Sequence, residues 1–417
     1  MSKPTILFRG PVKTRSGYGA HSRDILFALR EMNLFDISVD SSLWGSTPLT
    51  ALEEGNEFHD WIESNIVTKF DGVPDIYIQV TVPNEFRRYG KFNIGVTAGI
   101  ETTVAPKEWI DGCNVMDMII TTSTFSKDVL LSTMYNETEK LSGKLVKQHK
   151  IEKPINVLFE GVDTSIYNNN IDESFELDIK EDFAYLFVGH WLKGNVGQDR
   201  KDVGMLIKCF IEAFKDVEDR PALVLKTSSA TFSVKERENI IKKIESVVGE
   251  IKNPPSIYLL FGDLTDSEMN SLYNHPKIKS MVSITKGEGF GRPLLEFTMT
   301  GKPLIASNWS GQKDFLPMNK SVMVGGKLTD VDDSAIDNFI IKGSKWFTAN
   351  YSEVVEVFKL VYKDYDKFLE KSKTLMEENK EKFSIQKMVD VLKSYLEPFT
   401  IKPEQTKLIL PKLNKIK

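Results

Sequence analysis

Short apolar runs alternate with amphipathic segments along most of the chain. In the first half, runs with the length and composition of buried strands lie at residues 5–9, 75–80, 92–97 and 118–123. The segment 21–32 and the segment that starts at Phe125 have the apolar spacing of helices. Because strands and helices that alternate in this way build parallel sheets covered by helices, this half predicts an α/β domain.

The second half repeats the alternation. Its apolar runs lie at residues 183–189, 221–226, 256–261 and 279–284, and its helical patterns at 203–214, 354–375 and 383–396. The polar stretch 167–173 between the halves has the composition of a linker. We therefore predict a first domain over residues 1–168, a second α/β domain that begins at residue 169, and a lysine-rich tail at 401–417.

Composition narrows the class of protein. The chain has 417 residues, of which 41% are hydrophobic, and this is enough for two α/β domains with separate cores. The net charge of -5 gives no overall reason to expect a nucleic acid partner, although a local basic groove can be hidden in that average. Cys113 and Cys209 lie far apart in helical patterns, so we expect core packing in a reducing compartment and not a metal site. Without an apolar run of about eighteen residues, we predict a cytoplasmic protein.

Residues 139–153 carry a run of lysines with apolar residues between them, and we expect a basic helix there. The lysines are Lys140, Lys144, Lys147, Lys150 and Lys153. A basic amphipathic helix can lie on anionic lipid, which would bring the protein to a membrane surface. A charge run of this kind is more often the solvated face of a helix, so both interpretations stay open.

The stretch 283–297 combines a strand end, a glycine-rich loop and the start of a helix. Pro293 suits the first turn of a helix, where its missing N–H is not needed. Three glycines in the loop permit backbone conformations that other residues avoid, namely Gly287, Gly289 and Gly291. We expect a strand, a loop and a helix in this order.

This helix start predicts an anion site. We expect the backbone amides of Leu294 and Leu295 to be free, and together with the helix dipole they would favour a diphosphate. Glu288 and Glu296 would flank that site, and carboxylates beside a phosphate more readily accept hydrogen bonds from hydroxyl groups, as on a sugar and a ribose. A plain strand-to-helix turn with solvated glutamates fits the spacing equally well, since a glycine-rich loop alone is a weak signal.

From Glu288 to Glu296 the chain resembles the glutamate, seven residues, glutamate signature of retaining glycosyltransferases of family 4. Residues 301–311 resemble the next strand and loop of that family, and residues 155–164 resemble the end of its first domain. The resemblance covers nearly the whole chain. It implies the GT-B fold, in which two Rossmann-like α/β domains with parallel sheets face each other across a cleft. It also implies a donor domain over 169–382 and a last helix, about 383–400, that packs back on the first domain.

The loop 190–202 resembles the family loop whose glycine-arginine pair and downstream lysine hold the donor diphosphate. Lys201 matches that lysine, and Arg200 is the candidate for the second cation, because cations at this loop offset the charge of the leaving group. The chain departs from the pattern at His190, where arginine is common, and at Asp202, where glycine usually follows the lysine. His190 fits a buried core histidine equally well.

The resemblance implies a wider donor site. It comprises Gly17, Tyr18, Gly19, His190, Arg200, Lys201, Lys226, Thr227, Gly262, Leu264, Gly289, Phe290, Gly291, Arg292, Leu294, Leu295 and Glu296. Within it, Gly262 to Leu264 would contact the nucleobase through backbone groups, and Glu296 would bind the ribose. Residues 17–19 would form a glycine-rich loop opposite the diphosphate; their spacing does not match the dinucleotide fingerprint, which disfavours a nicotinamide cofactor.

The catalytic candidates are Glu288, Glu101 and Lys201. Glu101 follows the strand at 92–97 and would lie where the acceptor meets the transferred sugar, although it can also be a surface carboxylate that caps the helix near Pro106. The resemblance implies retaining transfer from a nucleotide-sugar to an acceptor hydroxyl, with no cofactor and no obligatory metal, since no Asp-x-Asp stands out as a cation site.

The acceptor stays undetermined, and a glycan, a lipid, a protein or a small molecule all fit. A modified nucleic-acid base is a further alternative, because residues 87–91 and the tail are basic, but the overall acidic charge argues against it. Two other classes remain open: a sugar-nucleotide epimerase of the same fold, and a non-catalytic protein that binds sugar nucleotides.

Overall fold

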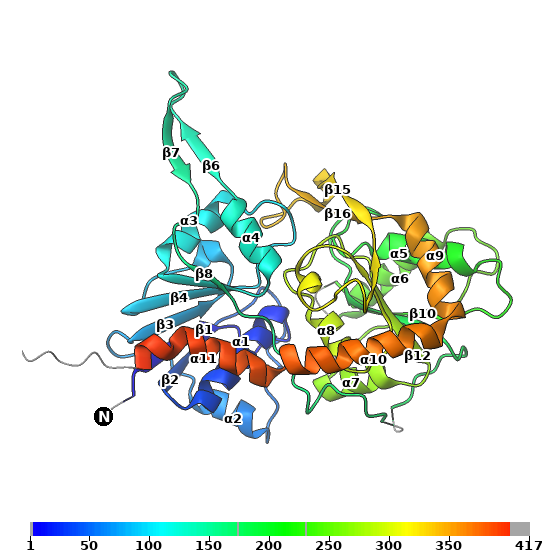
Figure 1. The fold of residues 1–417 in the computed structure, drawn as a ribbon, viewed down its shortest axis with the longest axis horizontal. Coiled ribbons are helices and arrows are strands. Elements are labelled where there is room, and N and C mark those ends of the chain that lie inside the picture. The colour runs from blue at the N-terminus through cyan, green and yellow to red at the C-terminus, as the bar shows by residue number, and fades with distance from the viewer. Residues whose placement is uncertain (1–2, 173–174, 230–231, 401–417) are drawn as a thin grey trace, which may run out of the picture.

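The computed structural model describes residues 3–172, 175–229 and 232–400, so the predicted tail lies outside the described residues. Two six-stranded parallel sheets stand side by side, each between two layers of helices (Figure 1). This confirms the predicted α/β class and the pair of Rossmann-like units. In the described part of the chain, no helix has both the length and the apolar character that crossing a membrane requires.

The first sheet has the strand order β2-β1-β3-β4-β5-β8. Its strands are β1 (Thr5–Gly10), β2 (Asp36–Ser41), β3 (Ile76–Val80), β4 (Phe92–Thr97), β5 (Met118–Thr121) and β8 (Ile155–Val157). One face packs against α1 (Gly17–Met32) and α2 (Glu57–Ser64). The other face packs against α3 (Lys107–Val115) and α4 (Thr124–Ser132), and a 3₁₀ turn, η1 (Pro83–Glu85), lies beside α3.

The second sheet has the strand order β11-β10-β9-β12-β13-β14, which is the order of dinucleotide-binding folds. Its strands are β9 (Ala184–His190), β10 (Ala222–Ser228), β11 (Ile257–Leu260), β12 (Ile278–Ser283), β13 (Leu304–Ser307) and β14 (Val322–Val324). Helices α5 (Val203–Phe214), α6 (Val234–Val248) and α9 (Tyr351–Lys363) cover one face. Helices α7 (Asp266–Asn274), α8 (Arg292–Thr298) and α10 (Tyr365–Lys382) cover the other.

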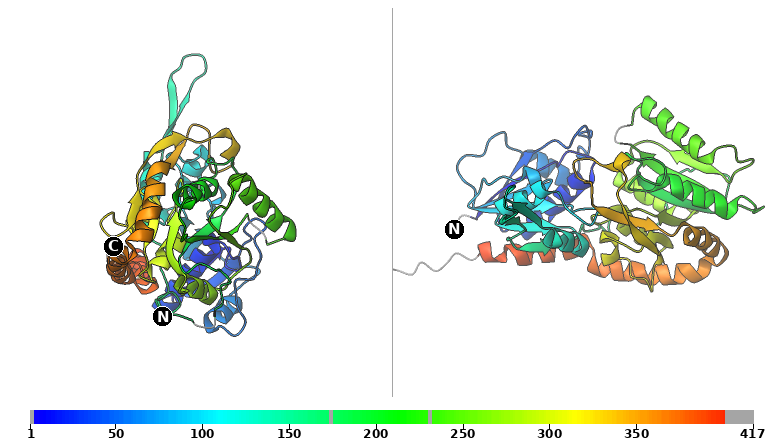
Figure 2. Two further views of the ribbon diagram at one scale, coloured as in Figure 1. Left: turned by 90° about the vertical axis from the view of Figure 1, so that its right-hand side faces the viewer. Right: turned by 90° about the horizontal axis from the view of Figure 1, so that it is seen from above.

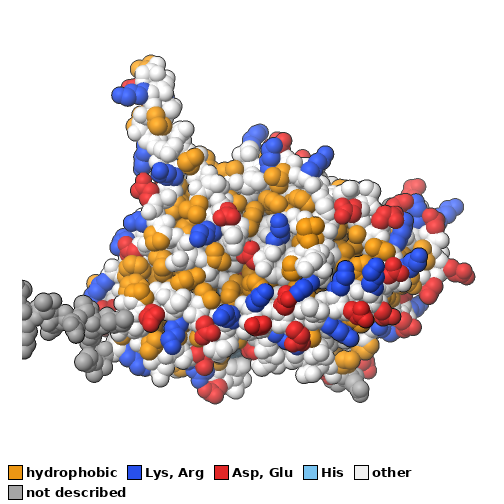
Figure 3. Space-filling view, viewed as in Figure 1, with side chains coloured by type: hydrophobic (Ala, Val, Ile, Leu, Met, Phe, Trp, Pro, Cys, Tyr) orange, Lys and Arg blue, Asp and Glu red, His pale blue; other side chains and the backbone are white. Residues whose placement is uncertain are grey.

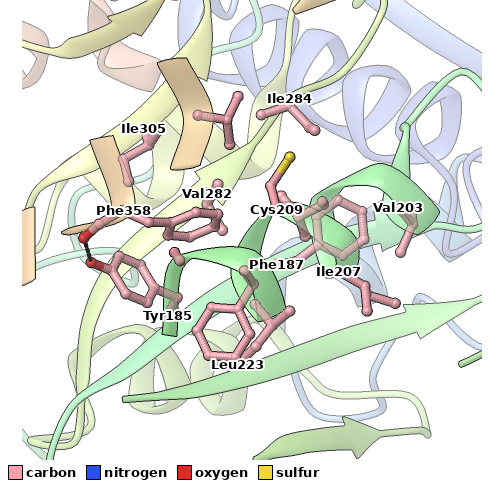
Figure 4. Close-up of a cluster of buried hydrophobic side chains, with 14 of the residues drawn as sticks. Tyr185, Phe187, Val203, Ile207, Cys209, Leu223, Val282, Ile284, Ile305 and Phe358 are labelled. Atoms are coloured by element: carbon pink, nitrogen blue, oxygen red, sulfur yellow. Dashed lines mark hydrogen bonds between the residues drawn. The ribbon is translucent and has the colours of Figure 1, made fainter. Parts of the chain in front are cut away.

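The core beneath α5 shows why this helix forms where the sequence predicts it. Val203 and Ile207 lie one turn apart, so both point into the sheet, where they meet Phe187 of β9 (Figure 4). Tyr185 is also buried there, and its hydroxyl donates a hydrogen bond to the carbonyl of Phe358, 2.7 Å away. Both cysteines are free and buried, as their helical setting predicts.

The end of the chain spans both sheets. The predicted helix 354–375 is wrong as a single element, because the chain leaves helical geometry at Asp364 and separates α9, which packs on α5, from α10, which packs on α8. Helix α11 (Ile385–Thr400) follows and packs on α1. Figure 2 shows α10 and α11 end to end along one flank of both α/β units.

The predicted basic helix at 139–153 is also wrong. These residues lie in and beside an antiparallel hairpin of β6 (Tyr135–Thr138) and β7 (Leu145–His149), which projects from the first α/β unit (Figure 1). Gly143 adopts a φ of 66° at the tip, a conformation that favours glycine, and the amide of Glu139 donates to the carbonyl of Lys144. The turn at Ser142 and Gly143 therefore interrupts the lysine pattern that resembled a helix.

A second hairpin, β15 (Gly326–Asp330) and β16 (Lys345–Ala349), reaches the first unit from the second. The amide of Thr103 donates to the carbonyl of Lys345 over 2.9 Å, and the amide of Lys345 donates to the hydroxyl of Thr103 over 2.9 Å. Two further 3₁₀ turns, η2 (Gly311–Asp314) and η3 (Asp333–Ala335), belong to the second unit. The two units thus touch both along the α10–α11 flank and at this hairpin.

Candidate functional site

The glycine-rich stretch lies where the strand order of the second sheet reverses. The loop after β9 and the loop after β12 leave neighbouring strands at their carboxyl ends, which is where open α/β sheets bind ligands. The two loops are joined directly, since the amide of Lys286 donates to the carbonyl of Arg200 over 2.7 Å. This contact brings residues 200–201 beside Glu288, although they are far apart in the sequence.

Glu288 forms two ion pairs at this point. Its Oε1 lies 2.5 Å from Nζ of Lys201, and its Oε2 lies 3.2 Å from a guanidinium nitrogen of Arg200. The amide of Glu288 donates to the hydroxyl of Ser310 over 2.9 Å, which fixes the backbone of the loop. Three of the predicted site residues therefore form one compact charged cluster.

Two opposing effects set the charge of this cluster. Burial alone would raise the pKa of Glu288, but Lys201 and Arg200 together hold that pKa below its usual value. Burial lowers the pKa of Lys201, and the Glu288 carboxylate opposes that change. Glu288 is thus held as a carboxylate although it is buried, which suits contact with a developing positive charge.

Glu101 joins the cluster from the first α/β unit. Its Oε1 lies 3.7 Å from the same guanidinium of Arg200, so Arg200 stands between two carboxylates. Burial raises the pKa of Glu101, Arg200 opposes this, and the nearby charge of Glu288 adds to the increase. Helix α3 begins after Pro106 without a side-chain cap, so Glu101 does not cap that helix.

The second glutamate of the signature lies in another buried cluster. Glu296 accepts hydrogen bonds from Nε of Arg292, 2.9 Å away, and from the hydroxyl of Tyr273, 3.3 Å away. Arg292 also pairs with Asp24 of α1 across the two units. Burial raises the pKa of Glu296 to about 7, although Arg292 opposes the increase. Arg292 thus links Glu296 to the opposite α/β unit.

The expectation of free amides at the start of α8 is wrong. The amides of Leu294 and Leu295 both donate to the carbonyl of Gly291, over 2.9 and 3.3 Å. Gly291 has a φ of 102° and precedes the first helical residue, so its carbonyl turns into the first turn and takes up these donors. Phe290 is buried and packs on Phe315, with ring centroids 5.0 Å apart.

The predicted base and phosphate contacts surround the carboxyl ends of β10 and β11. Nζ of Lys226 donates to the carbonyl of Gly262 over 2.6 Å, so this lysine organises the loop that leads to Leu264. Thr227 is buried and its hydroxyl has no hydrogen-bond partner in the described part of the chain. His190 is exposed and lies 3.0 Å from the hydroxyl of Ser228, so it is not a core histidine.

Residues 17–19 form the first turn of α1, so the expectation of a glycine-rich loop is wrong for them. Ser16 caps the helix by accepting a hydrogen bond from the amide of Gly19. A side chain at Gly19 would lie 2.2 Å from the carbonyl oxygen of Thr14, which explains the glycine there. The hydroxyl of Tyr18 lies 2.9 Å from that of Thr97, at the carboxyl end of β4.

The glycines of the signature allow the two units to touch. A Cβ atom on Gly287 would lie 2.0 Å from the carbonyl oxygen of Glu101, and one on Gly289 would lie 2.1 Å from that of Ala98. Ser123, at the end of β5, donates to the carbonyl of Gly289 over 2.5 Å. The glycine-rich loop therefore packs directly on the first unit.

A pocket of about 540 Å³ lies next to this contact, on the Glu296 side. It lies between α1 and α2 of one unit and the start of α7 of the other, and its charged lining includes Arg15, Arg23, Asp24, Asp266 and Arg292. No cluster of three or more His, Cys, Asp and Glu side chains suited to a metal ion occurs among the residues that the structure describes.

Comparison with known proteins identifies the architecture. No family model and no curated protein matches the chain. Among solved structures, sucrose-phosphate synthase from Thermosynechococcus elongatus is similar over 95% of this chain and 99% of that one, with a TM-score of 0.63 and 13% identity. HepE from Anabaena, in complex with UDP and glucose, is similar over 95% and 100%, with a TM-score of 0.58 and 12% identity. A glycosyltransferase from Rickettsia africae is similar over 96% and 99%, with a TM-score of 0.59 and 14% identity.

The chain has the GT-B fold. At these identities the likeness concerns the fold alone, and it agrees with the fold that the signature implies.

Sequence reasoning missed the residues that support the charged cluster without belonging to it, either from beneath its loops or from the opposite α/β unit. Asp24 sits inside the amphipathic pattern of α1, and Lys286 precedes the signature by two positions, so neither carries a local signal. Ser123 had a signal that was available, because polar residues at the carboxyl ends of parallel strands line the crevice. Asp202 was noted as a departure, and its partner is Lys286, 3.1 Å away.

Proposed function

We propose that the protein is a retaining glycosyltransferase that moves a sugar from a nucleotide-sugar to an acceptor hydroxyl without an obligatory metal. The observation that carries this proposal is the cluster of Glu288, Lys201, Arg200 and Glu101, which three separate stretches of a GT-B fold bring within ion-pair distance. The cluster offers cations for a diphosphate and carboxylates for hydroxyl groups and a positive transition state at one point of the cleft.

In this proposal, Lys201 and Arg200 offset the charge of the departing diphosphate. The bond between the anomeric carbon and the phosphate oxygen breaks, and positive charge develops on the sugar as in other glycosyl chemistry. Glu288, which Lys201 and Arg200 keep ionised, orients the donor sugar hydroxyls and stabilises that charge. The acceptor oxygen forms the new bond on the same face, its proton passes to the departing phosphate oxygen, and Glu101 holds the acceptor.

The pocket beside Glu296 suits the nucleoside end of the donor. The pocket is lined by Thr265 and Asp266, which follow the predicted base loop at Gly262 to Leu264, and by Arg292, the partner of Glu296. Glu296 would bind the ribose. HepE is in complex with UDP and glucose, so we infer a uridine diphosphate sugar as the first donor to test.

The deciding experiment offers the protein a panel of labelled sugar nucleotides together with host fractions of lipid, glycan, protein and DNA. We expect transfer to one fraction, with the anomeric configuration retained and with activity unchanged by EDTA. Loss of activity in EDTA that Mg²⁺ or Mn²⁺ restores would contradict the metal-free mechanism. If the sugar nucleotide is isomerised in the absence of an acceptor, the protein is an epimerase. Tight binding without turnover would indicate a binding protein, and label in the DNA fraction would indicate a nucleic-acid base as the acceptor.

We propose separately that the protein is cytoplasmic and contacts a membrane surface peripherally. The hairpin β6–β7 is the element that would make this contact. Leu141 at its tip is 98% exposed, and Leu145 and Val146 are exposed beside it. Figure 3 shows basic and hydrophobic side chains together on this projection. Apolar side chains can enter the headgroup region while lysines meet anionic lipid, so the hairpin fits an anionic membrane surface.

A further inference from the structure

The turn that carries Arg200 and Lys201 rests on a buried ion pair. Oδ2 of Asp202 lies 3.1 Å from Nζ of Lys286, and the two side chains are 0% and 1% exposed. The hydroxyl of Tyr351, the first residue of α9, donates to the same oxygen over 2.7 Å. The pair therefore lies directly behind the two cations of the cluster.

Lys286 connects three segments through its backbone and its side chain. Its amide donates to the carbonyl of Arg200, and its carbonyl accepts from the amide of Phe347 in β16, over 2.9 Å. Its ammonium donates to the hydroxyls of Thr348 and Tyr351, over 3.2 and 3.4 Å. The ammonium also lies 5.7 Å from the centroid of the Trp346 ring, on the same strand. Lys286 is thus held in place from several sides.

Asp202 occupies a position that favours glycine. Its φ is 55°, in the left-handed region, and it directly precedes the first residue of α5. Glycine would adopt this conformation at no steric cost, and the family loop that residues 190–202 resemble usually has glycine there. An aspartate in this conformation is strained, and its carboxylate is buried as well. Both effects are unfavourable, which indicates that the Asp202 side chain has a role of its own.

We infer that the Asp202–Lys286 pair, completed by Tyr351, positions Arg200 and Lys201 to receive the diphosphate of a sugar nucleotide. The pair joins the loop after β9 to the loop that carries Glu288, and it fixes the backbone on both sides of the Lys201–Glu288 contact. Among the described residues, the two side chains of the pair bond to each other, to Tyr351 and to Thr348, so we class them as positioning residues. This inference rests on the proposed function.

The test measures binding of UDP and of uridine by calorimetry, with GDP and ADP as further diphosphates, together with thermal unfolding. We expect Asp202→Asn, which keeps the size and tolerates the left-handed conformation, to weaken UDP binding about tenfold and uridine binding hardly at all. Tyr351→Phe, which removes a single hydroxyl, should give a smaller loss of the same kind. It keeps the test informative if Asp202→Asn does not fold.

Two comparisons distinguish a positioning role of the Asp202–Lys286 pair from a role in stability alone. When Lys201→Ala is already present, adding Asp202→Asn should leave the ratio of UDP to uridine affinity unchanged. Asp202 affects UDP binding only through the cations that it positions, and Lys201 is then absent. The double variant Asp202→Asn/Lys286→Met, which removes both buried charges, should regain thermal stability but not UDP affinity. Asp117→Asn, at the Arg88–Asp117 pair in the first α/β unit, is the matched control and should lower stability without changing the ratio.

The outcomes distinguish the two proposals. A wild-type protein that binds none of the three diphosphates overturns both the proposed function and the positioning role. A wild-type protein that binds one of them, with Lys201→Ala weakening it and Asp202→Asn leaving the diphosphate-to-nucleoside ratio unchanged, overturns the positioning role alone. Recovery of UDP affinity together with stability in the double variant also assigns the pair a purely structural role.

Discussion

Glu288 is the residue on which most of the proposed chemistry depends. It is buried, yet Lys201 and Arg200 keep it ionised, so its charge is available where the sugar would become positive. An electrostatic contact of this kind contributes most in a site that excludes water, because a low dielectric strengthens it.

Replacing Glu288 with glutamine keeps the shape of the side chain and removes its charge. We expect Glu288→Gln to lower the transfer rate by about a hundredfold or more while the fold stays intact, because the lost contact belongs to the transition state. The check is turnover with the donor that wild type uses, alongside thermal unfolding. Glu152→Gln, at an exposed position, is the control. Wild-type turnover of Glu288→Gln would exclude this glutamate from the mechanism.

Glu160 is a buried carboxyl that makes stability depend on pH. Burial raises its pKa to about 8, and the nearby charges of Asp24 and Glu296 add to this while Arg292 opposes it. The folded protein therefore keeps a proton that the unfolded chain loses above its usual pKa of 4.5. The free energy of unfolding should fall as the pH rises from 4.5 to about 8, by at most about 1.4 kcal/mol per pH unit.

Glu160→Gln should remove this contribution to the slope, since glutamine has no proton to lose in that range. Urea unfolding at pH 5, 6, 7 and 8 measures the effect. The free energy of unfolding of the variant should rise relative to that of wild type as the pH increases. Parallel pH profiles for the two proteins would show that Glu160 is ionised in the folded state.

The hairpin β6–β7 is the element whose role differs most from its sequence pattern. Between residues 135 and 150 it carries four lysines and two glutamates, and one of the latter, Glu137, lies 3.1 Å from Nε2 of the buried His149. Asp111 of α3 meets the other ring nitrogen at 2.7 Å. These contacts hold the base of the hairpin to the domain while the tip stays exposed, as an arm for a surface contact would require.

Shortening the hairpin tests the membrane proposal. Thr138 pairs with Leu145, so replacing residues 139–144 with Asn-Gly joins the strands by a two-residue turn that fits their register. We expect nucleotide binding and thermal stability to stay unchanged, while sedimentation with anionic phosphatidylglycerol vesicles falls, because Lys140, Leu141 and Lys144 are removed. Equal sedimentation of wild type with these vesicles and with neutral phosphatidylcholine vesicles would remove the hairpin's lipid role.

At the scale of the whole molecule, polar contacts join the two α/β units across the cleft. Arg292 pairs with Asp24 across the units, Ser123 donates to Gly289, and the amide of Thr124 donates to Asp314 over 2.8 Å. Aromatic rings also meet across the units, with the centroids of Phe125 and Trp309 4.7 Å apart, so the polar pairs are one part of what holds the units together.

Removing the Asp24 charge should shift the molecule toward an open form. We expect Asp24→Asn to increase the radius of gyration without nucleotide, measured by small-angle X-ray scattering, because Arg292 loses its partner on the opposite unit and keeps Glu296 on its own. Asp40→Asn removes an ion pair within the first unit, with Arg9, and should leave the radius unchanged. Identical radii for Asp24→Asn and wild type would show that this pair does not hold the cleft closed.

The sequence by itself determined the α/β class, most strands and helices, and the position of the glycine-rich loop at a strand-to-helix junction. These features depend on apolar spacing and on glycine and proline chemistry over a few neighbouring residues, as the match between the predicted and observed helix at 203–214 illustrates. Local pattern failed where a turn interrupted it, at Gly143 and Asp364, and where the carbonyl of Gly291 took up amides expected to be free.

Only the tertiary structure decided which charges meet. Lys201 and Glu288 are 87 positions apart, and Asp24 and Arg292 are 268 apart, so no local spacing reveals either pair. Burial then sets what the groups do, because removal from water raises the pKa of Glu160 and of Glu296 while adjacent cations keep Glu288 ionised. Ion pairing and desolvation act through space, and the chain acquires them only when its two α/β units are brought together.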